Sequence, residues 1–135
     1  MHKKGFTLIE ILLVVIIIGA LSSMVLPRLI GRSDQAKKTA AKVDIDTNIA
    51  TALKLYDLDN GTFPTTDQGL AALLIKPSTS PVPENWNGPY LERRSVDPWG
   101  RPYIYKSPGD HRPDYDLSSL GKDGKESDDD IKNWD

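Results

Sequence analysis

The sequence predicts an α+β fold, in which a long N-terminal helix packs against a small antiparallel sheet. Residues 6–30 form an apolar run that is long enough for a membrane-crossing helix. Residues 31–59 continue with apolar side chains at helical spacing, so the same helix is expected to become amphipathic. Residues 60–135 hold most of the ten prolines and ten glycines around two short alternating segments, which favours loops and short strands.

The apolar segment carries only two charges, Glu10 and Arg28. A helix over residues 6–30 would be roughly 37 Å long, enough to cross a hydrocarbon layer of about 30 Å. Pro27 lacks the N–H that an interior helical hydrogen bond requires. We therefore expect a kink or local unwinding of the helix in residues 23–27.

The second part of the helix is predicted from one apolar stripe. Five side chains recur at intervals of three and four residues, so they share one face of an α-helix. They are Ile45, Ile49, Ala52, Leu53 and Tyr56. Asn60 and Gly61 follow, and both residue types tolerate the left-handed conformation that ends many helices. We interpret the stripe as core, packed against the distal part of the chain.

The distal part of the chain is expected to be rich in loops, with one short helix and about three strands. The short helix is predicted to begin after Thr66 or Asp67 as its cap and to end before Pro77. Its apolar side would be formed by Leu70, Leu73 and Leu74. Alternating side chains favour strands at residues 103–106 and 115–119. A small antiparallel sheet packed on the helix would bury one face of both strands.

Composition and charge argue against a nucleic-acid partner and against a disulfide. The formal net charge is −2, yet residues 59–135 carry five more acidic than basic side chains. A surface of this sign repels nucleic acid, so no nucleic-acid partner is expected. The sequence contains no cysteine, so no disulfide can stabilise the domain.

No arrangement of residues predicts catalysis. His111 is the only histidine beyond the N-terminal region, and acidic and hydroxyl side chains lie near it in sequence. A hydrolase also needs a fixed base beside its nucleophile and an oxyanion site, and the sequence has a signature for neither. It has no phosphate-binding glycine loop, zinc-ligand spacing or dinucleotide fingerprint either. We expect a protein that is not an enzyme, with His111 on a surface loop.

The N-terminal segment would also suit an ordinary secretory signal. His2, Lys3 and Lys4 would be its basic start, and cleavage would fall near Ser22. Glu10 argues against this interpretation, because a carboxylate in lipid costs about 3 kcal/mol by insertion scales. Carboxylates inside a membrane normally face a partner, and this helix offers none.

The stretch KGFTLIE, residues 4–10, resembles the class III signal of type IV pilins and type II secretion pseudopilins. In that signal a basic leader ends in glycine, phenylalanine follows, and glutamate is the fifth residue of the processed chain. The resemblance implies a type IV pilin-like fold and removal of residues 1–5 by prepilin peptidase, which cuts between Gly5 and Phe6. It also implies methylation of the new Phe6 amine, whose positive charge would pair with Glu10 in the same or a neighbouring subunit.

Three further stretches resemble the major pseudopilins of type II secretion, the general secretion pathway protein G family. They are FPTTDQGL, DPWG and DLSSLGKDGKESDDDIKNW. This resemblance implies a structural subunit that polymerises with its own copies through the N-terminal helix and drives protein export across the outer membrane. The implied partners are minor pseudopilins, prepilin peptidase, the inner-membrane assembly platform and, indirectly, the secretion ATPase. The implied location is the bacterial inner membrane, crossed by one helix, with the C-terminal domain in the periplasm.

The sequence leaves the orientation and two other functions open. More basic residues follow the apolar run than precede it, so charge alone would place the distal part in the cytoplasm. A type IV pilus subunit would share the N-terminal signal, although such subunits often close their C-terminal loop with a disulfide. A secreted calcium-binding domain would result from cleavage near Ser22.

Five acidic side chains crowd a short stretch near the C-terminus. They are Asp123, Glu126, Asp128, Asp129 and Asp130. A charge run is usually a solvated loop, but like charges this close repel one another. A hard cation that prefers oxygen ligands, such as Ca²⁺, would relieve that repulsion.

The resemblance strengthens calcium as the expected cofactor, because major pseudopilins carry a calcium site in this loop. The implied ligands are the carboxylates of Asp123, Asp129 and Asp130 and the backbone carbonyls of Leu120 and Lys125. The loop is one residue shorter than the commoner family loop, which leaves Ser127 and Asp128 as further candidate ligands.

Overall fold

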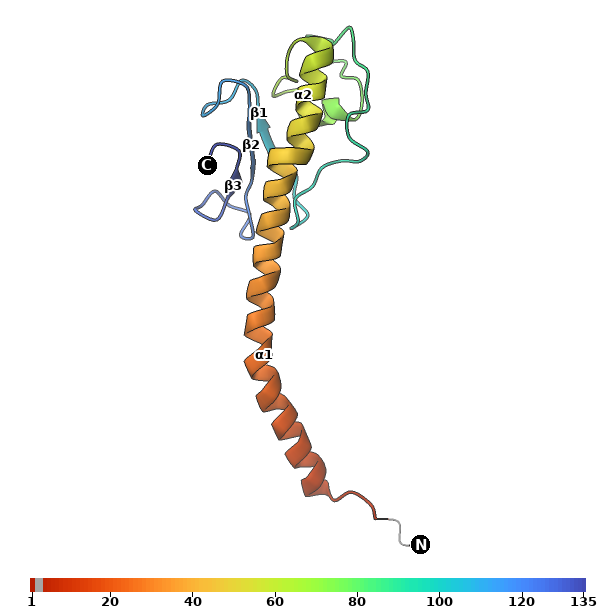
Figure 1. The fold of residues 1–135 in the computed structure, drawn as a ribbon, viewed down its shortest axis with the longest axis vertical. Helices are drawn as coiled ribbons and strands as arrows, with labels where there is room; N and C mark the ends of the chain where they lie inside the picture. The colour runs from red at the N-terminus through yellow and green to blue at the C-terminus, as the bar shows by residue number, and fades with distance from the viewer. Residues whose placement is uncertain (2–3) are drawn as a thin grey trace. The chain divides into compact units, whose positions relative to one another are not determined.

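The computed structural model describes Met1 and residues 4–135, so His2 and Lys3 of the predicted leader lie outside the described residues. The chain divides into two compact units, Met1–Ala36 and Lys37–Asp135. Figure 1 follows the chain from its N-terminus to its C-terminus and labels its helices and strands.

The N-terminal unit is built from the first part of helix α1 (Leu8–Val43), which continues into the second unit. Every side chain of residues 8–33 is exposed. Within the described residues, one helical run is long and apolar enough to cross a membrane, and it begins with this segment. The α-helix continues through Pro27, so the local unwinding expected there is wrong.

In the second unit the helix widens for one turn and then resumes. A π-helical turn, η1 (Asp44–Asn48), joins α1 to α2 (Ile49–Asn60). A π-turn closes its hydrogen bonds five residues apart, so it takes up one more residue than a turn of α-helix. The predicted stripe is confirmed, because each of its members is at most 2% exposed: Ile45, Ile49, Ala52, Leu53 and Tyr56.

Helix α2 ends where the sequence predicts. Gly61 adopts a left-handed conformation with φ of 76°, and its N–H donates to the carbonyl of Asp57 at 2.7 Å. The side-chain amide of Asn60 donates to the carbonyl of Tyr56 at 3.0 Å. The bond from Gly61 satisfies the carbonyl of Asp57, one of the last four carbonyls of the helix.

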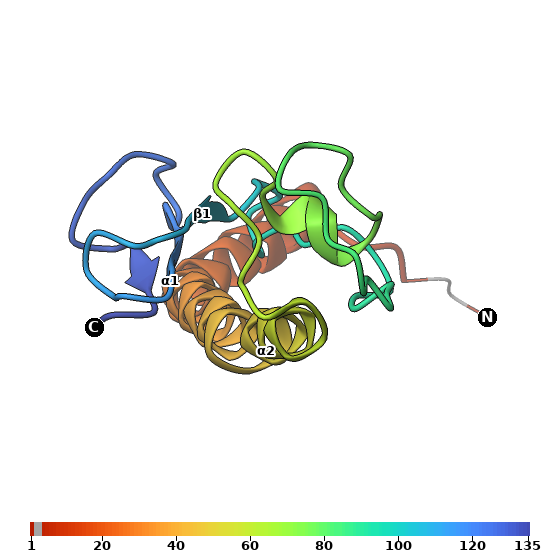
Figure 2. The same cartoon turned by 90° about the horizontal axis from the view of Figure 1, so that it is seen from above.

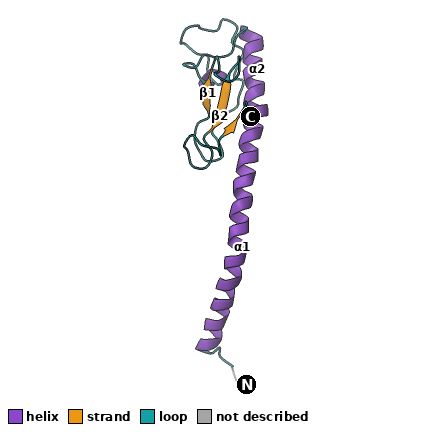
Figure 3. Cartoon of the chain, turned by 90° about the vertical axis from the view of Figure 1, so that its left-hand side faces the viewer, coloured by secondary structure: helices purple, strands orange, loops and turns teal. Residues whose placement is uncertain are grey.

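The distal part forms a three-stranded antiparallel sheet in the order β1-β2-β3 (Figure 3). The strands are β1 (Ile104–Lys106), β2 (Asp116–Ser119) and β3 (Ile131–Lys132). Tyr105 pairs with Leu117 across β1 and β2, and Ser118 pairs with Lys132 across β2 and β3. All four residues of β2 are buried, where an alternating pattern was expected.

The helix and the sheet enclose one core. Seven distal side chains join the helical stripe in it: Ala72, Leu73, Tyr103, Tyr105, Tyr115, Leu117 and Ile131. Figures 2 and 3 both show the distal segments gathered along one side of α2. The predicted fold class, a long helix packed on a small antiparallel sheet, is therefore confirmed.

The short helix differs from the prediction in its type and its cap. Segment η2 (Leu70–Leu73) is a 3-10 helix without a side-chain cap, so Thr66 and Asp67 as capping residues are wrong. Thr65 and Gln68 exchange two hydrogen bonds instead. The Thr65 N–H donates to Gln68 Oε1 at 3.0 Å, and the Gln68 N–H donates to Thr65 Oγ1 at 3.2 Å. This reciprocal pair is a capping box that stabilises the turn just before η2.

Candidate functional site

The first candidate site lies ahead of α1, in the N-terminal unit. Gly5 and Phe6 flank the predicted cleavage point, and both are exposed, Phe6 to 79%. A Cβ placed on Gly5 would have no neighbour within 4 Å. A peptidase therefore has open access to this peptide bond in the N-terminal unit.

In the intact chain Glu10 pairs with Thr7. The Thr7 N–H donates to Glu10 Oε2 at 3.4 Å, and the Glu10 N–H donates to Thr7 Oγ1 at 3.3 Å. This is a capping box, which the Thr-x-x-Glu spacing predicts but which our sequence analysis missed. The nitrogen of Phe6 is still part of a peptide bond here, so the positively charged partner expected for Glu10 exists only after cleavage.

The second candidate site is the loop between β2 and β3. Asp123, Asp129 and Asp130 each place one carboxylate oxygen so that the three atoms lie within 4.8 Å of one another. The loop begins at Gly121 with a φ of 64°, where a Cβ would lie 2.8 Å from the carbonyl oxygen of Asp129. Glycine is therefore needed at this position to let the two ends of the loop meet. The structure brings together the three carboxylates that were predicted to be ligands.

Ser127 lies between these carboxylates. Its Oγ contacts Asp123 Oδ2 at 3.1 Å and also contacts Asp129 Oδ1. A hydroxyl has a single proton, so it cannot donate to both acceptors at once. The hydrogen bond from Ser127 lowers the pKa of Asp129, which favours the ionised carboxylate. The single hydroxyl proton of Ser127 therefore cannot offset the negative charge of the neighbouring carboxylates.

Asp130 provides an independent sign that the cluster fits a cation. Its Oδ2 accepts a hydrogen bond from the Ser127 N–H at 3.2 Å. Its Oδ1 is buried and has no hydrogen-bond partner among the described residues. A buried carboxylate oxygen without a donor is unfavourable, and a hard cation would satisfy it. The residues present thus fit a hard, oxygen-binding cation.

The other predicted ligands differ in how close they lie to the cluster. Lys125 donates its backbone N–H to Asp123 Oδ1 at 2.9 Å, which places its backbone next to the cluster. Leu120 is half-buried and immediately precedes the glycine at which the loop begins. Asp128 is exposed and lies outside the group of three carboxylates.

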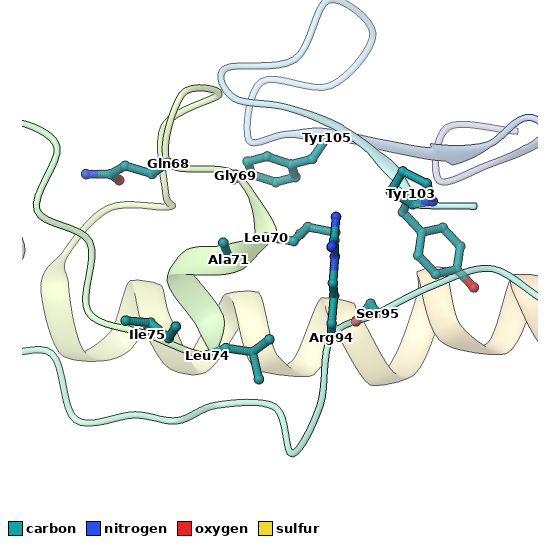
Figure 4. Close-up of a pocket in the computed structure, with 11 residues that line it drawn as sticks. Gln68, Gly69, Leu70, Ala71, Leu74, Ile75, Arg94, Ser95, Tyr103 and Tyr105 are labelled. Atoms are coloured by element: carbon teal, nitrogen blue, oxygen red, sulfur yellow. The ribbon is translucent and has the colours of Figure 1, made fainter. Parts of the chain in front are cut away.

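A cavity of about 460 Å³ lies beside η2 (Figure 4). Tyr103 and Tyr105 line it, but their hydroxyls donate to Asp44 Oδ2 at 2.9 Å and to the carbonyl of Pro64 at 2.7 Å. Burial raises the pKa of both phenols, so both remain protonated donors. Among the described residues, those that line the cavity include no histidine and no carboxylate. This cavity therefore offers no acid–base pair for catalysis.

His111 is exposed, as expected, and it belongs to a structural cluster. Its ring nitrogen Nδ1 lies 2.8 Å from Asp116 Oδ2, and its ring stacks on Trp134 with 4.2 Å between the ring centres. The same carboxylate accepts the backbone N–H groups of Asp110, His111 and Arg112 at 2.8 to 3.0 Å. Asp116 therefore fixes the turn that precedes β2.

Two family models match the chain, and together they span nearly all of it. The first, the prokaryotic N-terminal methylation motif, matches residues 1–26 and places the chain in the class of prokaryotic proteins with that motif. The second, type II secretion system protein G, matches residues 28–134. The chain belongs to the protein G family of type II secretion systems.

Named relatives and one solved structure agree with this assignment. Type II secretion system core protein G of Pseudomonas aeruginosa is 54% identical, over 99% of this chain and 96% of that protein. The Vibrio cholerae protein of the same name is 46% identical, over 98% and 92%. The crystal structure of the major pseudopilin from the type 2 secretion system of enterohaemorrhagic Escherichia coli is similar with a TM-score of 0.70 and 39% identity, covering 80% of this chain and 95% of that one. The family resemblance found in the sequence is confirmed.

Proposed function

We propose that this chain is the major structural subunit of a type II secretion pseudopilus and polymerises through its N-terminal helix to drive protein export across the outer membrane. The observation that carries this proposal is the exposed, mostly apolar segment of residues 8–33, in a member of the protein G family. A continuous apolar surface of this size marks an interaction with lipid or with other protein. Because the same apolar helix can contact either lipid or neighbouring helices, the subunit can pass from the membrane into a filament.

The proposed location and partners follow from this role. Prepilin peptidase cuts between Gly5 and Phe6, and the Phe6 amine is methylated. The processed chain crosses the bacterial inner membrane once, with its distal domain in the periplasm. Its partners are its own copies, minor pseudopilins, the inner-membrane assembly platform and, indirectly, the secretion ATPase. The role is assembly, and no catalysis is assigned to the chain.

Glu10 acts in this proposal as the group that sets the register of a subunit entering the filament. Among the described residues of the uncleaved chain, its carboxylate is bound by the N–H of Thr7, at the long distance of 3.4 Å. Cleavage creates an ammonium on Phe6 of every subunit. An ammonium and a carboxylate attract more strongly as the dielectric constant falls, so the pair is favoured among packed helices. The pair forms only when neighbouring helices are correctly aligned, which makes it a registration device.

Calcium is the cofactor that we assign to the loop between β2 and β3. The carboxylates of Asp123, Asp129 and Asp130 would hold it, together with the carbonyls of Leu120 and Lys125 and with Ser127 as a further candidate. When bound, a divalent cation supplies the positive charge that the cluster lacks. The part played by the chain is to bring the carboxylates together, and the Gly121 turn and the Ser127 hydroxyl both contribute to this.

Mass spectrometry of the membrane-purified mature protein tests the proposal. A chain that starts at methylated Phe6 and keeps its apolar helix supports the filament subunit. A chain that starts near Ser23 would have lost that helix, and the proposed function would be wrong.

A further inference from the structure

The turn that precedes β1 is tied to the acidic loop by a buried carboxylate. Asp97 is 3% exposed, and its Oδ1 accepts the backbone N–H groups of Trp99 at 3.0 Å and Arg101 at 2.8 Å. Its own N–H donates to the carbonyl of Arg101 at 2.7 Å. These three bonds fix both the turn and the direction in which the Arg101 side chain leaves it.

The second oxygen of Asp97 connects this turn to the beginning of the acidic loop. Asp97 Oδ2 accepts a hydrogen bond from Ser119 Oγ at 2.7 Å, and Ser119 Oγ accepts the N–H of Gly121 at 3.2 Å. Ser119 is 0% exposed. Gly121 is the glycine on whose backbone the two ends of the loop meet, so this chain of bonds fixes the point where the loop starts.

Arg101 reaches further into the same loop. Its Nη1 donates to the carbonyl of Gly121 at 2.8 Å, and its Nη2 lies 3.4 Å from the carbonyl of Lys122. Its guanidinium also lies against Gly124, where an added Cβ would be 2.6 Å from Arg101 Cζ. Both hydrogen bonds thus go to backbone carbonyls, although the loop is rich in carboxylates. A planar guanidinium suits this task, because its donors are held in a rigid fork.

We propose that Arg101 is a positioning residue for the calcium loop: it holds the backbone of residues 121–124 in the shape that brings Asp123 to Asp129 and Asp130. This inference rests on the calcium site proposed above. Arg101 contacts the backbone of the loop, so it acts through the loop's shape and is not itself a ligand.

Charge makes the proposal sharply testable. A guanidinium near a cation site repels the cation, so its charge alone weakens calcium binding. If Arg101 contributed only its charge, removing it would tighten calcium binding. If it positions the loop, removing it weakens calcium binding in spite of the lost repulsion. The two possibilities differ in the sign of the change.

The experiment measures calcium affinity by titration calorimetry on the full mature chain in detergent micelles. The variants are Arg101→Ala and Arg101→Lys, with Arg93→Ala as a control that removes one exposed positive charge elsewhere in the distal unit. We expect Arg101→Ala to weaken binding about 10- to 100-fold, the range found for residues that orient metal ligands. Arg101→Lys keeps the charge but loses the fork, so it should weaken binding as well. Unchanged or tighter binding by Arg101→Ala would overturn the proposal.

Hydrogen exchange without calcium separates the role of Arg101 from that of the metal. In EDTA, we expect the backbone amides of residues 121–127 to exchange faster in Arg101→Ala than in the unaltered chain, while those of β2 stay unchanged. Faster exchange throughout β2 as well would show a general structural role and overturn the proposal. If the unaltered chain itself binds no calcium, the calcium site is wrong, and this comparison still decides whether Arg101 orders the loop.

Discussion

The carboxylate of Asp116 gives the most quantitative prediction for the distal unit. Asp116 is 7% exposed, and both of its oxygens are used: Oδ1 accepts the N–H of Arg112 at 3.0 Å, and Oδ2 accepts those of Asp110 and His111. Asp116→Asn has almost the same shape but replaces one acceptor oxygen with an NH₂ group. At least one backbone N–H then faces a donor, and the remaining bonds lose the help of the negative charge.

The expected loss of stability follows from these contacts. One orphaned backbone donor costs about 1 to 3 kcal/mol, and weaker bonds at the other oxygen add to this, so Asp116→Asn should lower the free energy of unfolding by about 2 to 3 kcal/mol. Asp110→Asn is the matched control, because the same chemical change removes an exposed ion pair with Lys106 at 2.6 Å. Exposed ion pairs contribute about 0 to 1 kcal/mol.

Urea denaturation of the full chain in detergent, followed by tryptophan fluorescence, measures both variants. The three tryptophans, Trp86, Trp99 and Trp134, all lie in the second unit, so the signal reports only on that unit. The slope against urea should stay constant while the midpoint falls. A stability within about 0.5 kcal/mol of the unaltered chain, which is the usual range for surface substitutions, would refute the structural role of Asp116.

The same carboxylate predicts the direction of a pH effect. Burial opposes its ionisation, but the hydrogen bonds from His111, Arg112 and Asp110 outweigh burial and lower the pKa of Asp116 below its usual value. A group whose folded-state pKa is lowered stabilises the fold above its unfolded-state pKa of about 4, and this stability is lost as the pH falls through the folded-state pKa. Acidification should therefore destabilise the unaltered chain more than Asp116→Asn. Equal losses in both proteins would contradict this reasoning.

Three other substitutions test the remaining parts of the molecule. Glu10→Ala should insert into the membrane normally but assemble poorly in a filament assay, because the ammonium of Phe6 loses its partner; normal filaments would refute the registration role. Asp123→Ala, or removal of calcium with EDTA, should increase proteolysis of the loop between β2 and β3, and equal digestion patterns would count against the metal site. Ile45→Ala removes a fully buried side chain from the core and should lower the free energy of unfolding by about 2 to 5 kcal/mol, measured by the same urea assay.

The helix was predictable because its signals are local and periodic. The apolar run needs only length and composition, and the stripe from Ile45 to Tyr56 repeats at helical spacing. The sequence did not predict the π-helical turn η1. The apolar side chains recur at spacings of three and four residues both before and after this turn, so the pattern does not mark it. The local unwinding expected around Pro27 did not occur, because the α-helix runs unbroken from Leu8 to Val43.

The distal part was less predictable because its order comes from contacts between distant residues. β3 (Ile131–Lys132) has two residues, which is too short for any alternating pattern. The burial of Asp116 contradicts alternation and follows from the turn that wraps around its carboxylate. The three clustered carboxylates were predicted from charge density and family resemblance. The hydrogen bond from Arg101 to the carbonyl of Gly121 joins residues that lie 20 positions apart in the sequence. Such a contact produces no local sequence pattern from which it could be predicted.

The exposed surface of residues 8–33 has a consequence for what would power the growth of the proposed filament. Lipid tails are about as apolar as the leucine and isoleucine side chains of a neighbouring N-terminal helix. Moving this helix from the bilayer into a filament would therefore release little hydrophobic free energy. For the apolar side chains, the free energy of transfer from the bilayer to the filament would then be close to zero. In the proposed function, the direction of this transfer would therefore come from the pair of Glu10 with the Phe6 amine and from work done by the secretion ATPase.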